Sequence, residues 1–170
     1  MNLPDACAHP LGPNPQGPNP QGPNHPGGIR GDRLSLLACS DPKVLAQLLM
    51  PWAETEQIWL RRPETGLVMV QGRTGGTGTR FNLGEMSATR CTIRLTACGS
   101  TGVGWVSGRS AKHAELIALA DALLQSPRHC EEVCAKVIEP LITIRQTALE
   151  VAAALAAGTR VEFFTMTRGE

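Results

Sequence analysis

Hydrophobic residues first recur at helical spacing over residues 33–50. They fall into two groups, Leu34, Leu36 and Leu37 and then Val44, Leu45, Leu48 and Leu49. Ser40, Asp41 and Pro42 separate the groups. Serine is a common N-cap, and proline is tolerated in the first helical turn. The pattern predicts two short helices, the second capped by Ser40 and ended by Pro51.

The pattern then changes to period two, which is typical of strands. Residues 57–62 alternate, with Ile58 and Leu60 on one face, and residues 67–71 form a β-branched apolar run that predicts a buried strand. Residues 63–66, Pro-Glu-Thr-Gly, are a turn signal. We therefore expect these two strands to pair as a hairpin, followed by a short strand over residues 80–84.

The clearest alternation runs over residues 86–97, where one face carries Thr89, Cys91, Ile93, Leu95 and Ala97. The other face carries Arg90 and Arg94. A Gly-containing turn leads to a further strand over residues 103–108. Because only short turns join these segments, they are expected to form an antiparallel meander.

Helical patterns return after the strands. Residues 111–125 are apolar almost all round, with Ser110 as N-cap, so this helix is expected to be covered by the sheet on one side and by something else on the other. Residues 128–139 and 143–157 predict two more helices, interrupted at Pro140, with Gly158 as a C′ residue. The fold class is α+β: an antiparallel β-sheet (meander) with helices packed on it, N-terminal helices and a C-terminal helical region.

The two ends of the chain differ from the middle. Residues 1–28 carry Gly-Pro-Asn-Pro-Gln twice and then a degraded copy, which predicts a disordered Pro/Gly/Asn repeat tail. Residues 29–170 are then a single α+β domain. Residues 160–168 alternate weakly and suit either an added edge strand or a segment docked on a partner.

Composition excludes several classes of function. The net charge is +1, aromatic residues are few and tyrosine is absent, which argues against a nucleic-acid partner. No uninterrupted apolar run approaches the roughly 18 residues of a membrane span, and the first residues do not resemble a secretory signal. We therefore expect a cytoplasmic protein without a membrane partner, whose six cysteines are reduced thiols.

The loop over residues 72–80 is the first candidate site. Arg73, Gly75, Gly76, Gly78 and Arg80 combine a flexible backbone with two cations, so the loop's N–H groups suit an anion. The alternative, favoured by composition alone, is a flexible hairpin connection. A phosphate-binding Walker loop is excluded because its lysine is missing.

The second candidate is the start of the helix after the strands, with Arg109, Ser110, Lys112 and His113. A helix N-terminus attracts anions, and histidine can act as an acid, a base or a metal ligand. The alternative is an ordinary cap with solvated charges. Five arginines at one sheet edge would suit a phosphate-rich ligand, unless they pair with surface glutamates: Arg73, Arg80, Arg90, Arg94 and Arg109.

Few sequence features support a metal site or a catalytic centre. His129, Cys130 and Cys134 suggest zinc, but no second Cys pair accompanies them, and both cysteines fall in step with Val133 and Val137. Buried thiols are the favoured interpretation, and we expect no metal. No Ser-His-Asp arrangement or desolvated carboxylate pair is evident, so no catalytic residue is assigned.

Several strings together resemble one known family. Residues 64–81 read ETGLVMVQGRTGGTGTRF, and ATRCTIRL, VGWVSGRSAKHAE, ADALLQ and RVEFFTMTRG follow in order. These resemble the G-subunit (PhnG) family of the bacterial carbon–phosphorus lyase core complex over roughly residues 33–169. The proline repeat lies outside the family pattern.

The resemblance implies a non-autonomous subunit of a transferase complex in phosphonate catabolism, with PhnH, PhnI and PhnJ as partners. That complex exchanges the adenine of ATP for methylphosphonate, so MgATP is its substrate, and this chain alone is expected to bind no cofactor. An apolar helix over residues 111–125 and Phe163 with Phe164 would meet partners. The alternatives are a purely structural scaffold without substrate contact and a freestanding nucleotide-binding enzyme.

Overall fold

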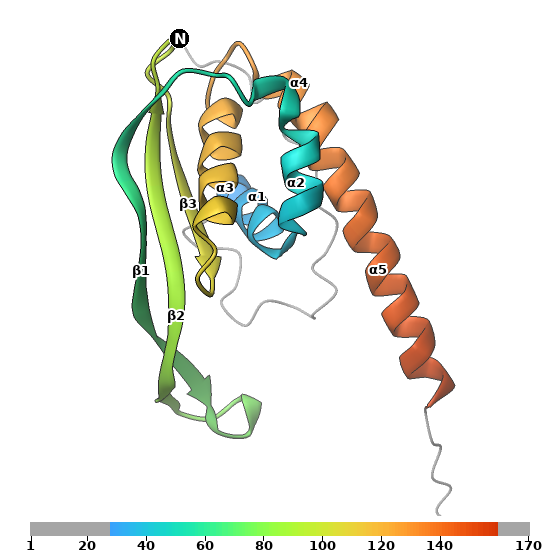
Figure 1. Cartoon of the computed structure of the whole chain (residues 1–170). Helices are drawn as coiled ribbons and strands as arrows, with labels where there is room; N and C mark the ends of the chain where they lie inside the picture. Colours follow the sequence, from blue (N-terminus) through green and yellow to red (C-terminus); the bar gives the residue numbers. More distant parts are fainter. Residues whose placement is uncertain (1–27, 160–170) are drawn as a thin grey trace, which may run out of the picture.

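The computed structural model describes residues 28–159. Its sheet has three antiparallel strands in the order β1 (Gln57–Arg73), β2 (Arg80–Leu95) and β3 (Thr101–Ser107). Helices precede and follow the sheet and cover one of its faces (Figure 1). The predicted α+β class and antiparallel meander are confirmed. The repeat tail and residues 160–170 lie outside the described residues.

The predicted hairpin between residues 57–62 and 67–71 is wrong. Both segments belong to β1, which pairs along its length with β2, and the chain reverses only at residues 74–79. The turn signal instead marks an irregularity, because the register shifts between Arg61 and Glu64, around Pro63. A proline without an N–H is tolerated at a bulge of an edge strand, and β1 is an edge strand.

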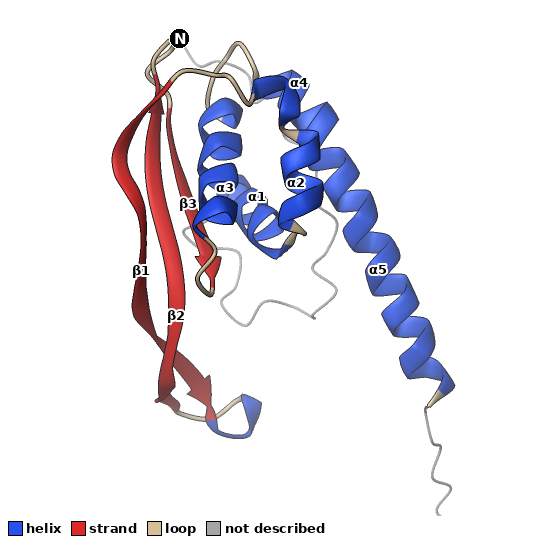
Figure 2. Ribbon diagram, in the orientation of Figure 1, coloured by secondary structure: helices blue, strands red, loops and turns tan. Residues whose placement is uncertain are grey.

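The long alternation in β2 is confirmed where the helices cover it. Thr89, Cys91, Ile93 and Leu95 are buried, whereas Ala97 lies in the exposed turn after the strand. The predicted burial of residues 67–71 is wrong: Leu67 and Met69 are exposed because this half of the β1–β2 hairpin extends beyond the helices (Figure 2).

Helix α3 (Ala111–Leu124) lies directly on β2 and β3. Gly102 and Gly104 of β3 make this contact close: a Cβ atom on Gly104 would lie 1.9 Å from the Ala114 carbonyl oxygen, and one on Gly102 would lie 2.0 Å from that of Ala118. The missing side chains of the strand therefore let the backbone of the helix approach the backbone of the sheet.

The other side of α3 is covered by this chain itself. Helices α1 (Gly28–Cys39), α2 (Pro42–Leu48) and α4 (Cys130–Val133) all contact it, and eleven of its fourteen residues are buried. The all-round apolar pattern thus predicted correctly that a second layer exists. The further inference that this helix would meet a partner subunit is wrong, because the second layer is intramolecular.

Two helix boundaries differ from expectation. The N-cap of α2 is Asp41, whose carboxylate accepts a hydrogen bond from the Lys43 N–H at 2.7 Å, whereas the Ser40 hydroxyl donates to the Leu37 carbonyl. Helix α2 ends at Leu48, and Pro51 lies in the 3₁₀ turn that follows. Pro42 occupies the first helical turn, as predicted.

The predicted break at Pro140 is also wrong. Helix α4, a π turn over Cys134–Ile138 and α5 (Glu139–Gly158) form one continuous helix, Cys130–Gly158. Pro140 sits in the first turn of α5, directly after the wide π turn, where a missing N–H is accommodated. Within residues 28–159 this is the one helix whose length and composition would allow it to cross a membrane, a test that buried core helices and signal sequences also pass.

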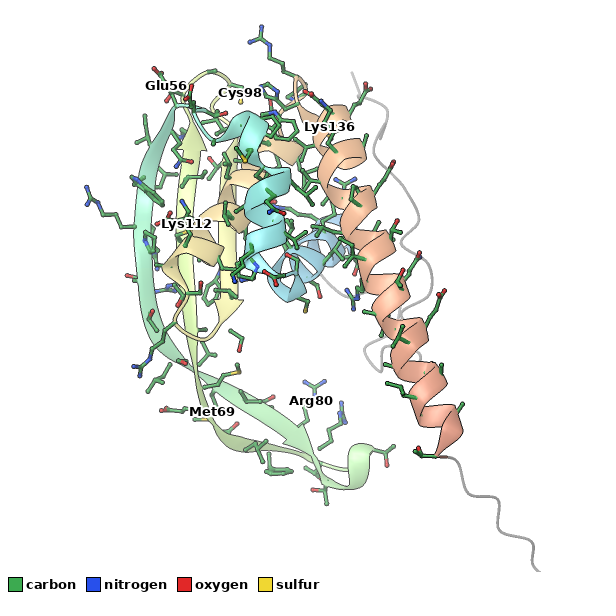
Figure 3. All side chains as sticks on the ribbon, turned by 45° about the vertical axis from the view of Figure 1, so that its right-hand side comes forward. Glu56, Met69, Arg80, Cys98, Lys112 and Lys136 are labelled. Carbon is green, nitrogen blue, oxygen red and sulfur yellow. The ribbon has the colours of Figure 1, made fainter. Side chains whose placement is uncertain are left out.

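Two elements leave the body of the molecule at the same end. Figures 1 and 3 show the outer half of the β1–β2 hairpin and the outer half of α5 both extending beyond α1, α2 and α3. Residues 143–158 of α5 are almost all exposed. The core that the helices and sheet bury therefore holds only the inner part of each: residues 88–95 of β2 and the start of α5.

Candidate functional site

The glycine-rich loop forms the tip of the β1–β2 hairpin. Arg73 and Arg80 face each other as the last pair of the ladder, and a 3₁₀ turn, Thr74–Gly76, joins them. Gly75 and Gly76 have φ angles of 59° and 82°, which favour glycine. Gly78 packs so closely that a Cβ atom would lie 2.6 Å from the Thr74 carbonyl oxygen. The predicted reason for these glycines, a specialised backbone, is therefore correct.

Some polar groups of this loop already form hydrogen bonds with each other. The Arg73 guanidinium donates to the Gly78 carbonyl at 3.3 Å, and the Gly78 N–H donates to the Thr74 carbonyl at 2.8 Å. Arg73 thus closes the loop, while Arg80 is exposed beside it (Figure 3). What remains for a ligand or a partner is an exposed cationic tip rather than an enclosed cradle.

The second candidate cluster lies where α3 begins. Ser110 caps the helix as predicted, accepting a hydrogen bond from the His113 N–H at 3.3 Å. Arg109 and Lys112 are exposed, and Lys112 lies 3.5 Å from Glu115. His113 is only 5% exposed, and its Nε2 atom lies 3.0 Å from the Leu37 carbonyl oxygen of α1. The ring therefore joins α3 to α1 and does not face an anion site.

The structure does not bring the two clusters together. Ser107, at the end of β3, pairs with Ala88, and Arg80 lies eight residues further along β2. At about 3.3 Å per residue this is a separation of roughly 26 Å along the strand. The two clusters cannot contact one small ligand in this conformation, and each has to be assigned a role separately.

The five arginines do not converge either. Arg90 pairs with Glu64 at 2.7 Å on the sheet face away from the helices, and Arg61 reaches the same carboxylate at 2.9 Å. These two cations hold the pKa of Glu64 below its ordinary value. Arg90 also stacks over Trp105, with its guanidinium carbon 5.4 Å from the ring centroid. For Arg90, the alternative of surface pairing is the correct one.

The most extensive candidate surface is apolar. The outer half of the β1–β2 hairpin exposes large hydrophobic side chains, with Leu67 at 66% and Leu83 at 67% of their full accessibility: Leu67, Met69, Phe81, Leu83 and Met86. The outer half of α5 exposes another set: Ile144, Leu149, Val151 and Leu155. We call these the hairpin surface and the α5 surface. On the hairpin, Leu67 and Met69 lie on one face, whereas Met86, which pairs with Val68, and Phe81, which pairs with Gly72, lie on the other. Exposed apolar side chains gathered on one element are typical of sites that other proteins cover.

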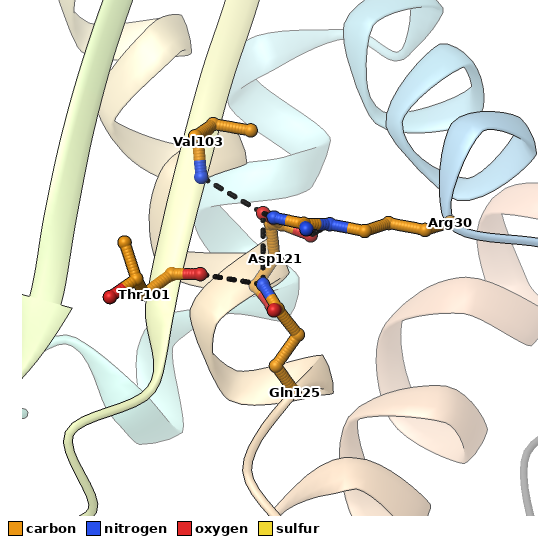
Figure 4. A network of polar contacts seen from close by, with 5 residues as sticks. All are labelled: Arg30, Thr101, Val103, Asp121 and Gln125. Atoms are coloured by element: carbon orange, nitrogen blue, oxygen red, sulfur yellow. Dashed lines mark hydrogen bonds and ion pairs between the residues drawn. The ribbon is translucent and has the colours of Figure 1, made fainter. Parts of the chain in front are cut away.

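A buried polar cluster holds three elements together and escaped the sequence analysis (Figure 4). Asp121 of α3 is 2% exposed and accepts two hydrogen bonds from Arg30 of α1, at 3.0 and 2.7 Å. The same carboxylate accepts from the Val103 N–H at 2.9 Å and from Gln125 at 3.2 Å. The signal that could have revealed it is a single acidic residue in the otherwise apolar second half of α3.

The cysteines show the predicted burial in part. Cys134 is buried and Cys130 is half-buried against the core. Burial raises the pKa of the Cys91 thiol to about 11, so this group stays neutral and unreactive. Within residues 28–159 no three His, Cys, Asp or Glu side chains gather in a metal-binding group.

Comparisons with known proteins identify a family. A family model described as "Phosphonate metabolism protein PhnG" matches residues 29–169. A similar protein of Rhizobium meliloti (strain 1021), named alpha-D-ribose 1-methylphosphonate 5-triphosphate synthase subunit PhnG, is 41% identical over 131 residues, covering 74% of this chain and 82% of that protein. The family resemblance found from the sequence is thereby confirmed, and the chain belongs to the PhnG family of phosphonate metabolism proteins.

Proposed function

We propose that this chain is an accessory subunit of a cytoplasmic alpha-D-ribose 1-methylphosphonate 5-triphosphate synthase. In the reaction of such a complex, a phosphonate oxygen forms a bond to the anomeric carbon of ATP's ribose. The bond from that carbon to adenine breaks, and adenine leaves with a proton. MgATP and methylphosphonate are substrates of the assembly, and PhnH, PhnI and PhnJ are the other subunits.

The observation that carries this proposal is the pair of exposed apolar surfaces. The hairpin surface and the α5 surface leave the body at the same end, and neither packs on the core of this chain. Exposing Leu67, Leu83 and Leu155 to water is unfavourable by roughly 25 cal/mol for each Å² of apolar area. Burial against other subunits recovers this free energy, which supports a chain that works inside an assembly.

The first experiment tests assembly. We expect Leu67→Asp and Leu83→Asp, made in the co-expressed complex, to reduce co-purification of the other subunits by at least about tenfold, because a charge at the centre of an apolar interface is poorly solvated. The side chains are exposed, so circular dichroism of the purified chain should not change. The measurement is the subunit ratio after affinity purification.

A neighbouring substitution supplies the control for charge. Asn82→Asp adds the same negative charge one residue away from Leu83, at a polar position whose side-chain oxygen accepts a hydrogen bond from Gln71. It should leave the subunit ratio unchanged. If Leu83→Asp and Asn82→Asp co-purify equally well with the other subunits, the hairpin surface is not an interface and this support for the proposal is lost.

The second experiment asks whether the chain also contacts a substrate. We expect Arg80→Ala at the hairpin tip to lower adenine release by the assembled complex at least about tenfold, as loss of a guanidinium–phosphate contact does. Arg109→Ala tests the start of α3 in the same way. His113 is unsuitable for this purpose, since its ring packs between α3 and α1.

The outcomes separate the two roles. Loss of adenine release with an intact subunit ratio supports a direct substrate contact by the arginine concerned. Normal adenine release by both variants supports the alternative, a purely structural scaffold. Loss of assembly in Arg80→Ala would show that the interface with other subunits includes the cationic tip as well as the hairpin surface.

A further inference from the structure

The outer half of the β1–β2 hairpin is a two-stranded ribbon with an open edge. Strand β3 pairs only with residues 88–94 of β2, so β1 and β2 continue beyond it as a pair. Such a ribbon is marginally stable in water, and a third strand stabilises it. Within residues 28–159 no strand pairs with the other edge of β1. The backbone groups along that edge are therefore available to a further strand.

The strand register shows which residues offer these backbone groups. The Gly108 N–H donates to the Ser87 carbonyl at 2.8 Å, so the backbone of Ser87 faces the β3 side of β2. Leu67 lies opposite Ser87 in the ladder, and an antiparallel pair exchanges either both backbone bonds or neither. Leu67 therefore points its N–H and C=O away from β2. By alternation Thr65 and Met69 do the same.

The two halves of this edge differ in their protection against pairing. The inner half carries two arginines and a proline at residues 61–63, and charged residues and proline keep an edge strand from pairing. Residues 65–72 contain neither a charged residue nor a proline. Glu64 lies at the inner end of this stretch and Arg73 at the hairpin tip. The edge therefore suits a strand that is uncharged in its middle, with a base near Glu64 and an acid near Arg73.

One segment of this chain outside the described residues has that pattern. Residues 163–167 read Phe-Phe-Thr-Met-Thr, uncharged and rich in strand-forming types, with Glu162 before them and Arg168 after them. The two aromatic residues are neighbours, so a strand places one ring on each face of the sheet. Both faces of the outer hairpin expose apolar side chains that such rings would cover. Residues 1–27 carry the proline repeat instead, and proline cannot donate along a ladder.

Charge selects the direction of the added strand. If it runs antiparallel to β1, Glu162 lies towards the cationic tip, which Arg73 and the exposed Arg80 form. Arg168 then lies towards Glu64, whose side chain is 50% exposed and open to a further cation. A parallel strand would place like charges together at both ends, which is unfavourable. The antiparallel direction is therefore the one that fits.

The reach of the chain decides which molecule supplies the strand. Helices α1 and α2 lie between α3 and α5 (Figure 1), so α5 lies roughly 20 Å or more from the sheet, at about 10 Å for each packed layer. From Thr159, at the end of α5, to Glu162 the chain extends at most about 10 Å. Glu162 of the same chain therefore does not reach Arg73 in this conformation. A second copy is free of this limit, because it approaches the hairpin from outside.

We propose that residues 162–168 of one molecule add an antiparallel strand to residues 65–71 of β1 in a second copy of this chain. Two copies make this exchange reciprocally about a two-fold axis, so the contact is closed. It occupies the edge of the hairpin and leaves both apolar faces to other proteins. The pairing is therefore independent of the proposed synthase role, and the failure of one leaves the other standing.

Amide hydrogen exchange, resolved at single residues, tests the strand pairing. The native full chain, purified with the subunits that accompany it, is compared with Thr165→Pro, which disrupts a ladder at the centre of the segment. We expect the Leu67 and Met69 amides to exchange at least about tenfold faster in the variant, because they lose their acceptors. The Val68 and Val70 amides face β2, so they should not change and serve as the internal reference.

A second proline variant is the matched control. Gly169→Pro introduces the same residue just beyond the segment, and it should leave the Leu67 and Met69 exchange rates at their native values. Equal rates in Thr165→Pro and Gly169→Pro would mean that this edge is covered by another protein or by none. Either result would overturn the proposal.

Cross-linking identifies the molecule that supplies the strand. Two differently tagged copies are co-expressed, one with Met69→Cys and the other with Thr165→Cys, and are treated with a short bis-maleimide. We expect at least about tenfold more linkage between the tags than for Gln57→Cys with Thr165→Cys, since Gln57 begins the protected half of β1. Equal yields would overturn the proposal. So would linkage that forms only within a single chain carrying both cysteines, because the segment would then pair with its own hairpin.

Discussion

Replacing Asp121 by alanine is expected to lower the free energy of unfolding by about 3 kcal/mol, because one buried carboxylate serves three partners. It pairs with Arg30 of α1 at 2.7 Å and accepts from the Val103 N–H of β3 at 2.9 Å. Alanine leaves that strand N–H without an acceptor and removes the charged link to α1. Urea unfolding followed by circular dichroism measures the change.

The control lies on the same helix. Glu115→Ala removes an equal charge, but within residues 28–159 the ion-pair partner of Glu115 is the exposed Lys112 at 3.5 Å, so the expected change is below about 1 kcal/mol. Asp121→Asn keeps an acceptor for the Val103 N–H and should fall between the two. Equal destabilisation by Asp121→Ala and Glu115→Ala would show that the cluster in Figure 4 does not hold α1 and β3 to α3.

The parts of the fold that depend on local pattern were predictable from the sequence. The alternation in β2 and the apolar helix α3 with its Ser110 cap were both confirmed, since period and capping chemistry are local properties. The errors arose where a distant segment decided the outcome. Pro63 suggested a turn, but a sixteen-residue partner strand keeps β1 extended through it. At Pro140 a π turn compensates for the missing N–H, a device without a sequence signature.

At the candidate site, too, local features could be predicted from the sequence, whereas features that depend on distant segments could not. The specialised backbone of the 72–80 loop could be predicted because Gly75 and Gly76 carry their own conformational signal. The burial of His113 could not, since its partner is a carbonyl 76 residues away on α1. The distance between His113 and Arg80 could not be predicted either. It depends on how far the β1–β2 hairpin extends beyond β3, and this follows from which strands pair.

Because the hairpin tip and the start of α3 lie apart, each cluster has to act in its own surroundings. A cationic tip lies at the end of an apolar hairpin surface, while the start of α3 lies beside the core roughly 26 Å away. A subunit that joins other chains through the hairpin would carry Arg73 and Arg80 to the boundary between chains. A phosphate-bearing substrate held there would contact more than one subunit.

The second large effect is expected at Gly104, where alanine should destabilise the fold by at least about 3 kcal/mol, the upper end of ordinary overpacking. Its Cβ atom would lie 1.9 Å from the Ala114 carbonyl oxygen and 3.0 Å from the Ala118 backbone nitrogen. These are backbone atoms of a buried helix, so no side-chain rotation relieves the overlap. Helix α3 would have to move away from the sheet, and the contacts on its other side with α1 and α2 oppose that movement.

A second glycine of the sheet provides the matched comparison. Gly66 lies in β1 opposite Ala88, and a Cβ atom there would meet nothing within 4 Å. Gly66→Ala should therefore be neutral or stabilise the chain by up to about 1 kcal/mol, through the lower entropy of the unfolded state. The measurement is again the midpoint of urea unfolding. A Gly104→Ala variant as stable as Gly66→Ala would mean that α3 does not rest on the β3 backbone, and the close helix–sheet contact that fixes Arg109 and His113 in place would have to be abandoned.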